Sequence, residues 1–131
     1  MFSQEQFSKI EEILKKDLID KGVKCVLLID MAGNIIANSE SNEAKLDVYS
    51  LAALAAGNYG AMAAMANIVG EDDFSLLFHK GRDVNLHFAN ILDDYLLIDI
   101  FDNGFSLGFL RLIVADAAKK IEFILNHQPD K

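Results

Sequence analysis

The chain has 131 residues, of which 52% are hydrophobic and one is proline. This length and composition predict a folded domain with a real core and exclude a disordered chain. The formal net charge of −8 disfavours nucleic acid and anionic membranes as partners. We therefore expect one domain over residues 1–127, followed by a frayed tail over residues 128–131.

Signals for export or membrane insertion are not evident in the sequence. The N-terminus lacks a basic segment followed by an apolar block, and no uninterrupted apolar run reaches about 18 residues. Cys25 is the only cysteine, so an internal disulfide or a multi-cysteine metal site is not possible. Together these features favour a cytoplasmic protein.

A first helix is predicted to begin after Ser3 and to end near Gly22. Ser3 and Gln6 have the spacing of a capping box, and Phe2 and Phe7 have the spacing of a hydrophobic staple. Apolar residues then recur at helical spacing along one face.

Two strands are predicted to follow as a hairpin. Residues 23–30 form an apolar run without clean alternation, which is typical of a strand covered on both faces. Residues 31–34 favour a turn, because Gly33 and Asn34 tolerate positive φ, and residues 35–38 return as a short strand.

The segment SLAALAAGNYGAMAAMANI, residues 50–68, is predicted to form a central helix. Eight of its nineteen residues are alanine, Asp47 can cap its start, and Gly70 can end it in a left-handed conformation. No charged residue occurs between Val48 and Gly70. Since a surface helix normally carries charge on its solvent face, the missing charge indicates that more than one face is covered.

The residues of this helix sort by size around its axis. A large, mostly apolar stripe is predicted to pack on the core; it consists of Leu51, Leu54, Asn58, Met62, Met65 and Val69. A small-residue face lies roughly opposite and consists of Ala53, Gly57, Gly60 and Ala64. Two interpretations follow: the helix packs on its own sheet and offers a face to other chains, or it is buried inside its own domain. The first is favoured, because a chain this short has few elements to serve as cover.

Three more strands and a last helix complete the chain. The strands are predicted over residues 74–80, 84–91 and 95–101, with turns at 81–82 and 93–94. Ser106 can cap a final helix, whose apolar residues recur at helical spacing to about His127.

The predicted order of elements is α-β-β-α-β-β-β-α. Because every direct link between strands is short, the five strands are expected to form an antiparallel sheet whose two halves are joined by a helical crossover. One helix on one face and two on the other would cover it. The fold class is therefore α/β, of the α+β sandwich type.

Groups of catalytic or metal-binding residues are not apparent. His79, His87 and His127 come from different elements and lack the spacing of metal ligands. The aspartates that could suggest a hard-cation site, Asp93, Asp94, Asp99 and Asp102, are mostly explained by turns. No nucleophile elbow and no glycine-rich phosphate loop is present. We expect no metal, no cofactor and no catalytic centre.

The two arginines are candidates for an arginine finger, the usual device by which a protein accelerates a GTPase in trans. Arg82 lies in an exposed turn, and Arg111 lies in the first turns of a helix, where a local ion pair is the ordinary role. Neither is expected to act as a finger.

Four segments resemble the Roadblock (dynein light chain) family, most closely its bacterial MglB-type branch. They are VLLIDMAGNIIA, SLAALAAGNYGAMAAMA, FSLLFHKGRDVNLHF and FDNGFSLGFLRL, and they cover nearly the whole chain in the family's order. The resemblance implies the same five-stranded sandwich. It also implies a homodimer, joined where the central helices pack and where the strand after each helix continues the partner's sheet.

The resemblance further implies that two MglB-type protomers bind one Ras-like GTPase of the MglA type. They bind it through a platform formed by the paired central helices, promote GTP hydrolysis without a finger of their own, and serve cell polarity and gliding motility. Carried over to this chain, the GTPase platform would consist of Ala53, Gly57, Gly60, Ala64 and Asn67. The dimer interface would consist of Ala52, Ala56, Tyr59, Ala63, Phe74, Leu76 and Phe78.

The leading hypothesis is thus a homodimeric, non-enzymatic regulator of a small GTPase, with GTPase-activating function. One alternative is a scaffold or exchange platform that binds the GTPase without activating it. A further alternative is a small-molecule sensor of the PAS or GAF type, which would need a cavity between the sheet and a helix.

Overall fold

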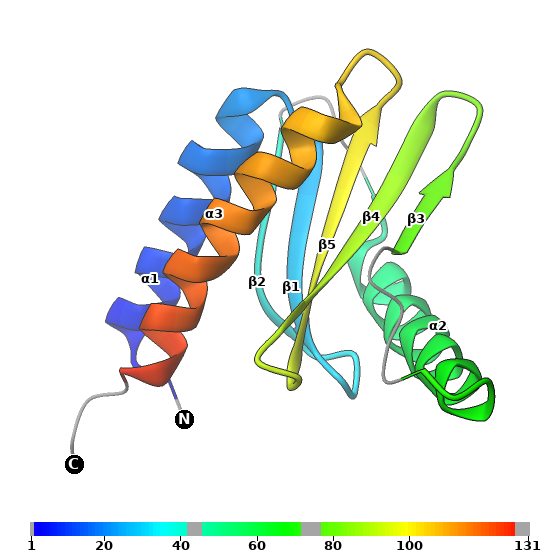
Figure 1. Ribbon diagram of the computed structural model, residues 1–131. Coiled ribbons are helices and arrows are strands. Elements are labelled where there is room, and N and C mark those ends of the chain that lie inside the picture. The colour runs from blue at the N-terminus through cyan, green and yellow to red at the C-terminus, as the bar shows by residue number, and fades with distance from the viewer. Residues whose placement is uncertain (1, 42–45, 72–76, 128–131) are drawn as a thin grey trace.

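A five-stranded antiparallel sheet separates two helical layers in the computed structural model, which describes residues 2–41, 46–71 and 77–127 (Figure 1). The helical segments are α1 (Gln4–Ile13), η1 (Leu14–Leu18), η2 (Ile19–Lys21), α2 (Val48–Ile68) and α3 (Leu107–Asn126). The strands are β1 (Cys25–Asp30), β2 (Ile35–Glu40), β3 (Leu77–Lys80), β4 (Val84–Ile91) and β5 (Tyr95–Asp102). The predicted fold class is confirmed.

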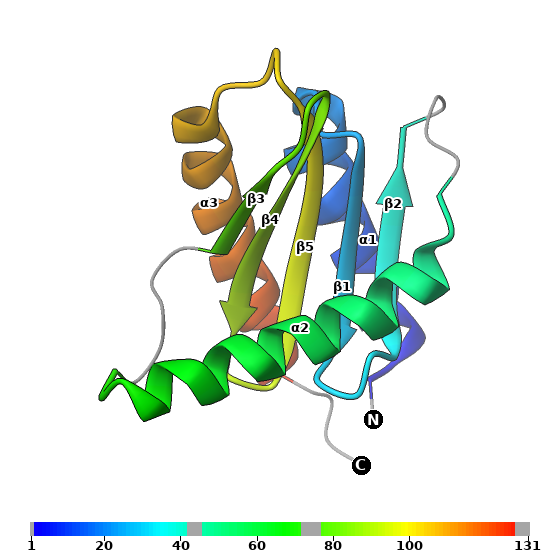
Figure 2. The ribbon, with the colours of Figure 1, turned by 90° about the vertical axis from the view of Figure 1, so that its right-hand side faces the viewer.

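The strand order in the sheet is β2-β1-β5-β4-β3, and each neighbouring pair is antiparallel. The helix α2 covers one face, while α1 and α3 lie side by side on the other (Figures 1 and 2). β2 and β3 are therefore the two edge strands.

The start and end of the first helical segment follow from the predicted local signals. The Ser3 hydroxyl accepts a hydrogen bond from the Gln6 amide at 3.1 Å, and the Gln6 side chain accepts one from the Ser3 amide at 2.8 Å. The rings of Phe2 and Phe7 meet edge to face with centroids 5.9 Å apart. Gly22 ends the segment with φ at +120°.

The β1–β2 turn is ordered by its own side chains. The Asp30 carboxylate accepts hydrogen bonds from the amides of Ala32 and Asn34, at 3.0 and 2.9 Å. Gly33 has φ at +92°, and a Cβ added there would lie 3.2 Å from the Ala53 backbone. The turn thus touches the first half of α2. β2 runs two residues further than predicted, because its polar end still pairs with β1.

The core is divided by the sheet into two hydrophobic clusters. The cluster under α1 and α3 includes Leu14, Leu28, Phe101, Leu110 and Ile121. The cluster under α2 includes Leu27, Ile29, Ala52, Tyr59 and Ile98. Because side chains alternate along a strand, successive residues of β1 and β5 supply opposite clusters.

The predicted orientation of α2 is wrong. The buried side chains of this helix are Ala52, Ala55, Tyr59 and Ala66. Of the large stripe that was expected in the core, Leu51 and Met62 are partly buried against the sheet, whereas Leu54, Asn58, Met65 and Val69 are exposed. The reason is the size of the strand side chains: β1 and β5 present leucines and isoleucines, so alanines let α2 approach the sheet closely.

The second half of the chain agrees with the predicted elements, with small shifts at their ends. Residues 74–76 of the expected strand 74–80 lie outside the described residues, and β3 is described from Leu77. The turn after β4 has positive φ at Leu92 and Asp93. The Ser106 hydroxyl caps α3 by accepting from the Phe109 amide at 3.2 Å.

Candidate interaction surface

The outer face of α2 carries large apolar side chains in contact with solvent. Leu54, Met65, Ile68 and Val69 are 73%, 49%, 83% and 66% exposed. Figure 2 shows that α2 crosses the strands and that its C-terminal part extends beyond the edge strand β3. Large exposed apolar patches on soluble domains mark interaction sites, so α2 is the first candidate surface.

The small-residue face is open to solvent as well. All five residues assigned to the GTPase platform, Ala53, Gly57, Gly60, Ala64 and Asn67, are exposed. A Cβ placed on Gly57 or Gly60 would meet no atom within 4 Å. These glycines are therefore not required by packing inside the protomer, and the surface can admit a closely approaching chain.

The residues assigned to the dimer interface do not form one surface. Ala52 and Tyr59 are buried against the protomer's own sheet, whereas Ala56 and Ala63 are half-buried on the flank of α2. Phe78 belongs to the opposite layer, where its ring stacks on Phe101 with centroids 6.0 Å apart. Phe74 and Leu76 lie outside the described residues.

β3 lies at one edge of the sheet and pairs only with β4 among the described residues. Its outer side leaves backbone amides and carbonyls available for another strand, which is the usual basis for pairing between chains. This edge lies on the same side of the molecule as the overhanging end of α2 (Figure 2).

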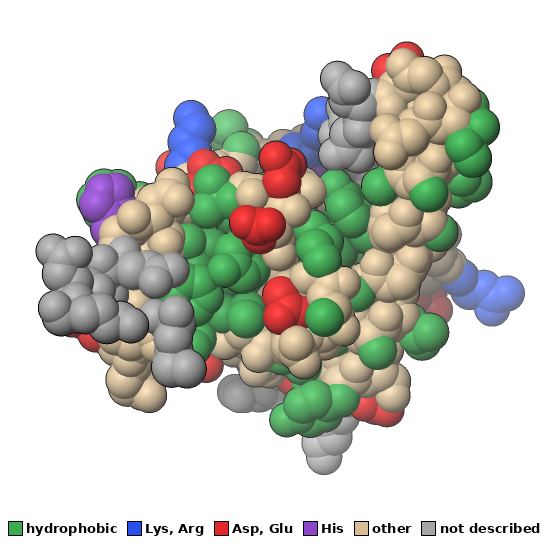
Figure 3. Space-filling view, turned by 90° about the horizontal axis from the view of Figure 1, so that it is seen from below, with side chains coloured by type: hydrophobic (Ala, Val, Ile, Leu, Met, Phe, Trp, Pro, Cys, Tyr) green, Lys and Arg blue, Asp and Glu red, His purple; other side chains and the backbone are tan. Residues whose placement is uncertain are grey.

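A groove of about 330 Å³ runs along the flank of α2. It is lined by Met31, Ala56, Tyr59, Gly60, Ala63, Asn90 and Asp93. The groove thus lies between α2 and the turns at one end of the sheet, on the face seen in Figure 3.

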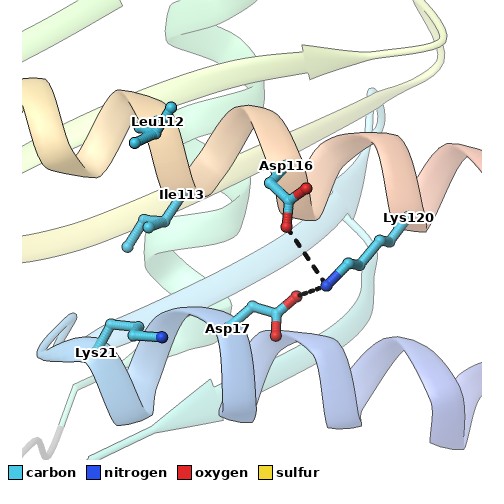
Figure 4. Close-up of a pocket in the computed structure, with 6 residues that line it drawn as sticks. All are labelled: Asp17, Lys21, Leu112, Ile113, Asp116 and Lys120. Carbon is cyan, nitrogen blue, oxygen red and sulfur yellow. Dashed lines mark hydrogen bonds and ion pairs between the residues drawn. The ribbon is translucent and has the colours of Figure 1, made fainter.

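A second groove lies between α3 and the end of the first helical segment (Figure 4). The Lys120 ammonium contacts the Asp17 carboxylate at 2.8 Å and the Asp116 carboxylate at 3.4 Å. The pair with Asp17 crosses the groove and ties η1 to α3, whereas Asp116 and Lys120 lie one turn apart on α3 itself. Since all three side chains are at least one quarter exposed, they contribute little to stability.

A buried histidine–aspartate pair lies between β4 and β5. His87 Nδ1 and Asp99 Oδ2 are 3.2 Å apart, and Asp99 Oδ1 has no hydrogen-bond partner among the described residues. Burial raises the pKa of the Asp99 carboxyl, and the hydrogen bond with His87 acts in the opposite direction. This pair was not predicted from the sequence, although the turn after Ile91 sets the register that places His87 opposite Asp99.

The remaining candidates for chemistry are separated from one another. His79 is exposed on β3, 3.4 Å from the Asn58 amide, and His127 stacks on Phe123 after α3. Burial raises the pKa of the Cys25 thiol to about 12, so it is not an activated nucleophile. Within the described parts of the chain, no three His, Cys, Asp or Glu side chains converge to hold a metal ion, and no helix there could cross a membrane.

The sandwich and its exposed central helix define a domain of the Roadblock class. The sequence profile of the Roadblock/LC7 domain matches residues 9–100, and the chain therefore belongs to this family.

Solved structures of MglB are similar over nearly the whole chain. MglB of Myxococcus xanthus is 33% identical, with a TM-score of 0.89 and coverage of 100% of this chain and 97% of that one. The gliding protein MglB of Thermus thermophilus is 28% identical, with a TM-score of 0.84 and coverage of 95% and 93%. A further MglB, described with a tetrameric arrangement, is 28% identical, with a TM-score of 0.86 and coverage of 95% and 92%. No match is found among curated protein sequences.

Proposed function

We propose that this protein is a homodimeric, non-enzymatic regulator of a small Ras-like GTPase and that it promotes GTP hydrolysis. The observation that carries the proposal is the uncharged outer surface of α2, where large apolar side chains and bare glycines lie in solvent. The similarity to MglB over the whole chain supports it. A GTPase of the MglA type is the proposed partner, in a cytoplasmic polarity or gliding system.

The proposed dimer uses the overhanging end of α2 and the free edge of β3. Met65, Ile68 and Val69 would be covered by the partner protomer, whose own β3 would continue the sheet. Ala52 and Tyr59 leave the proposed interface, because the protomer's own core already buries them. Ala56 and Ala63 leave it as well, because they line the groove on the flank of α2.

The proposed GTPase platform is the small-residue face of the paired α2 helices. Ala53, Gly57, Gly60, Ala64 and Asn67 remain its members, since all are exposed. Because the backbone lies close to the surface there, a partner can approach without displacing side chains. The protein would then regulate the GTPase by changing the GTPase's conformation, and no group of this chain would take part in hydrolysis.

The test is binding and turnover with the Ras-like GTPase encoded in the same genome, loaded with a GTP analogue or with GDP. We expect the GTP-loaded form to bind selectively and GTP hydrolysis to accelerate. Binding without acceleration would instead indicate a scaffold or exchange platform. Absence of binding to either form would overturn the proposal and favour the alternative of a small-molecule sensor.

The variant Gly60→Arg locates the platform. A Cβ at this position is unobstructed and arginine favours helix, so the fold and the dimer should persist while GTPase binding is lost. Gly108→Arg is the matched control, because it makes the same exchange at an exposed glycine of α3 on the other layer. If Gly60→Arg unfolds the protein, or if both variants bind normally, the platform is misplaced.

A further inference from the structure

The groove beside α2 is lined by small residues on the side of the helix and by one charged residue on the side of the sheet. Ala56, Gly60 and Ala63 supply the helical side, while Met31 and Asp93 come from turns at the end of the sheet. Figure 3 shows acidic side chains on this face, next to hydrophobic ones and between the two helical layers. Asp93 is the only charged residue that lines the groove within the described chain.

The position of Asp93 relative to α2 is fixed by one side chain. Asn90 Oδ1 accepts a hydrogen bond from the Asp93 amide at 2.8 Å, and Asn90 Nδ2 donates to the Tyr59 hydroxyl at 2.7 Å. Asn90 therefore links the β4–β5 turn to α2, and it lines the groove together with Tyr59 and Asp93. Asp93 adopts φ of +62°, a conformation that aspartate and asparagine tolerate better than most residues.

The Asp93 carboxylate is available for a partner. It makes no hydrogen bond and no ion pair with any residue that the structure describes. The neighbouring Asp30, by contrast, is occupied by the amides of its own turn. Both polar groups of the Asn90 side chain are also engaged.

A groove with a largely apolar lining and a free carboxylate is complementary to one kind of side chain. Lysine and arginine combine a long aliphatic stem with a cationic head, and they lay the stem along apolar surface while the head reaches a polar group. A charge-assisted hydrogen bond to a carboxylate is stronger than a neutral one. A neutral side chain in the groove would leave the Asp93 carboxylate without an ion-pair partner, and an acidic one would be repelled by it.

We propose that this groove receives a lysine or arginine side chain of the GTPase, with its stem on Ala56, Ala63 and Met31 and its head on Asp93. The proposal rests on the function proposed above and deepens it, since Gly60 belongs to both the platform and the groove. Asp93 is then a determinant of which GTPase is recognised, because a partner without a cation at this place loses the pair.

The chain provides its own control in the adjacent residue. Asp94 is exposed in the same turn and carries the same charge, but it does not line the groove. Asp93→Asn removes the charge and keeps a residue that tolerates left-handed backbone, while Asp94→Asn makes the identical chemical change one position away. Any loss of GTPase affinity that is caused only by the change in net charge affects both variants alike.

The experiment measures the dissociation constant of the GTPase loaded with a GTP analogue, by calorimetry at low and high salt. We expect Asp93→Asn to weaken binding about tenfold or more and Asp94→Asn less than about twofold. Asp93→Lys should abolish binding. The salt dependence should fall for Asp93→Asn only, and the thermal midpoint and oligomeric size of each variant should remain unchanged.

The outcomes separate this inference from the function on which it rests. Tight binding by Asp93→Asn, or equal losses for the two asparagine variants, would overturn the inference and leave the GTPase regulator intact. A wild-type chain that binds no GTPase would overturn both. If replacing one lysine or arginine of the GTPase by alanine matches the loss of Asp93→Asn, and combining the two adds nothing, the pair is identified.

Discussion

At the scale of single residues, the buried pair of His87 and Asp99 is the main departure from an apolar core. The Asp99 side chain is fully buried, and one of its oxygens has no hydrogen-bond partner within the described residues. Burying a carboxylate without full compensation favours its protonated form, which is why its pKa is raised. The pair lies under the layer of α1 and α3, away from the α2 surface.

This pair predicts a pH dependence of stability. The folded-state pKa of Asp99 lies above the unfolded value of about 3.9, so the folded protein holds more protons in the interval between them. The contribution of Asp99 is therefore fully present below about pH 4 and is lost as the pH rises through the folded-state pKa. Relative to the wild type, the variant Asp99→Asn should gain free energy of unfolding as the pH is raised from about 4.

The measurement is urea unfolding of wild type and variant at a series of pH values. Asp102→Asn is the control, because Asp102 lies on the same strand but remains partly exposed. A difference between Asp99→Asn and wild type that stays constant with pH would show that Asp99 does not change its protonation in this range.

At the scale of elements, local signals fix where each helix begins, and α3 offers a clean test. Its cap is the hydrogen bond from the Phe109 amide to the Ser106 hydroxyl. Ser106→Ala should lower the free energy of unfolding by about 1 kcal/mol, because one helix-start amide loses its partner. Urea unfolding at one fixed protein concentration measures the change.

Ser8→Ala is the matched control for this cap, since Ser8 is an exposed residue inside α1. The same loss of a hydroxyl should there be neutral or stabilising by up to about 0.5 kcal/mol, because alanine is the better helix former. Equal losses of stability in the two variants would contradict the role of Ser106 as a cap.

What could be predicted from the sequence follows the same division between local and non-local causes. The capping box at Ser3, the turn at Gly33 and the order of the elements depend on neighbouring residues, and these predictions are confirmed. The face that α2 turns to the sheet depends on the strand side chains it meets, so the prediction that Leu54 would be buried was wrong. The pairing of His87 with Asp99 required knowledge of the register between β4 and β5.

At the scale of the whole molecule, one end of α2 projects past the sheet with no cover from the described part of its own protomer. Ile68 is 83% exposed there, at the side where β3 also has a free edge. A second copy would cover both features with one two-fold contact, in which the same surface of each protomer is used. The stability of the protein would then depend on its concentration.

Placing a charge at this end of α2 should therefore separate the protomers. We expect Ile68→Glu to weaken the dimer by at least about 100-fold, because a carboxylate would have to be buried without a partner. Light scattering across a dilution series measures the change. Leu112→Glu is the control, since Leu112 is 68% exposed on α3, on the other layer. A monomeric wild type, or an Ile68→Glu dimer of undiminished strength, would contradict the proposed interface.

The close approach of Gly33 to the backbone of Ala53 carries a consequence for the geometry of such an assembly. The turn packs against the first half of α2, while the strands pack against the middle of the helix. A methyl group at Gly33 would raise that half and tilt the helix about its middle. In a two-fold dimer both helices would tilt together, so the angle between them would change by twice the tilt of one. The shape of the shared platform can thus be tuned from Gly33, a residue of the turn that lines neither contact.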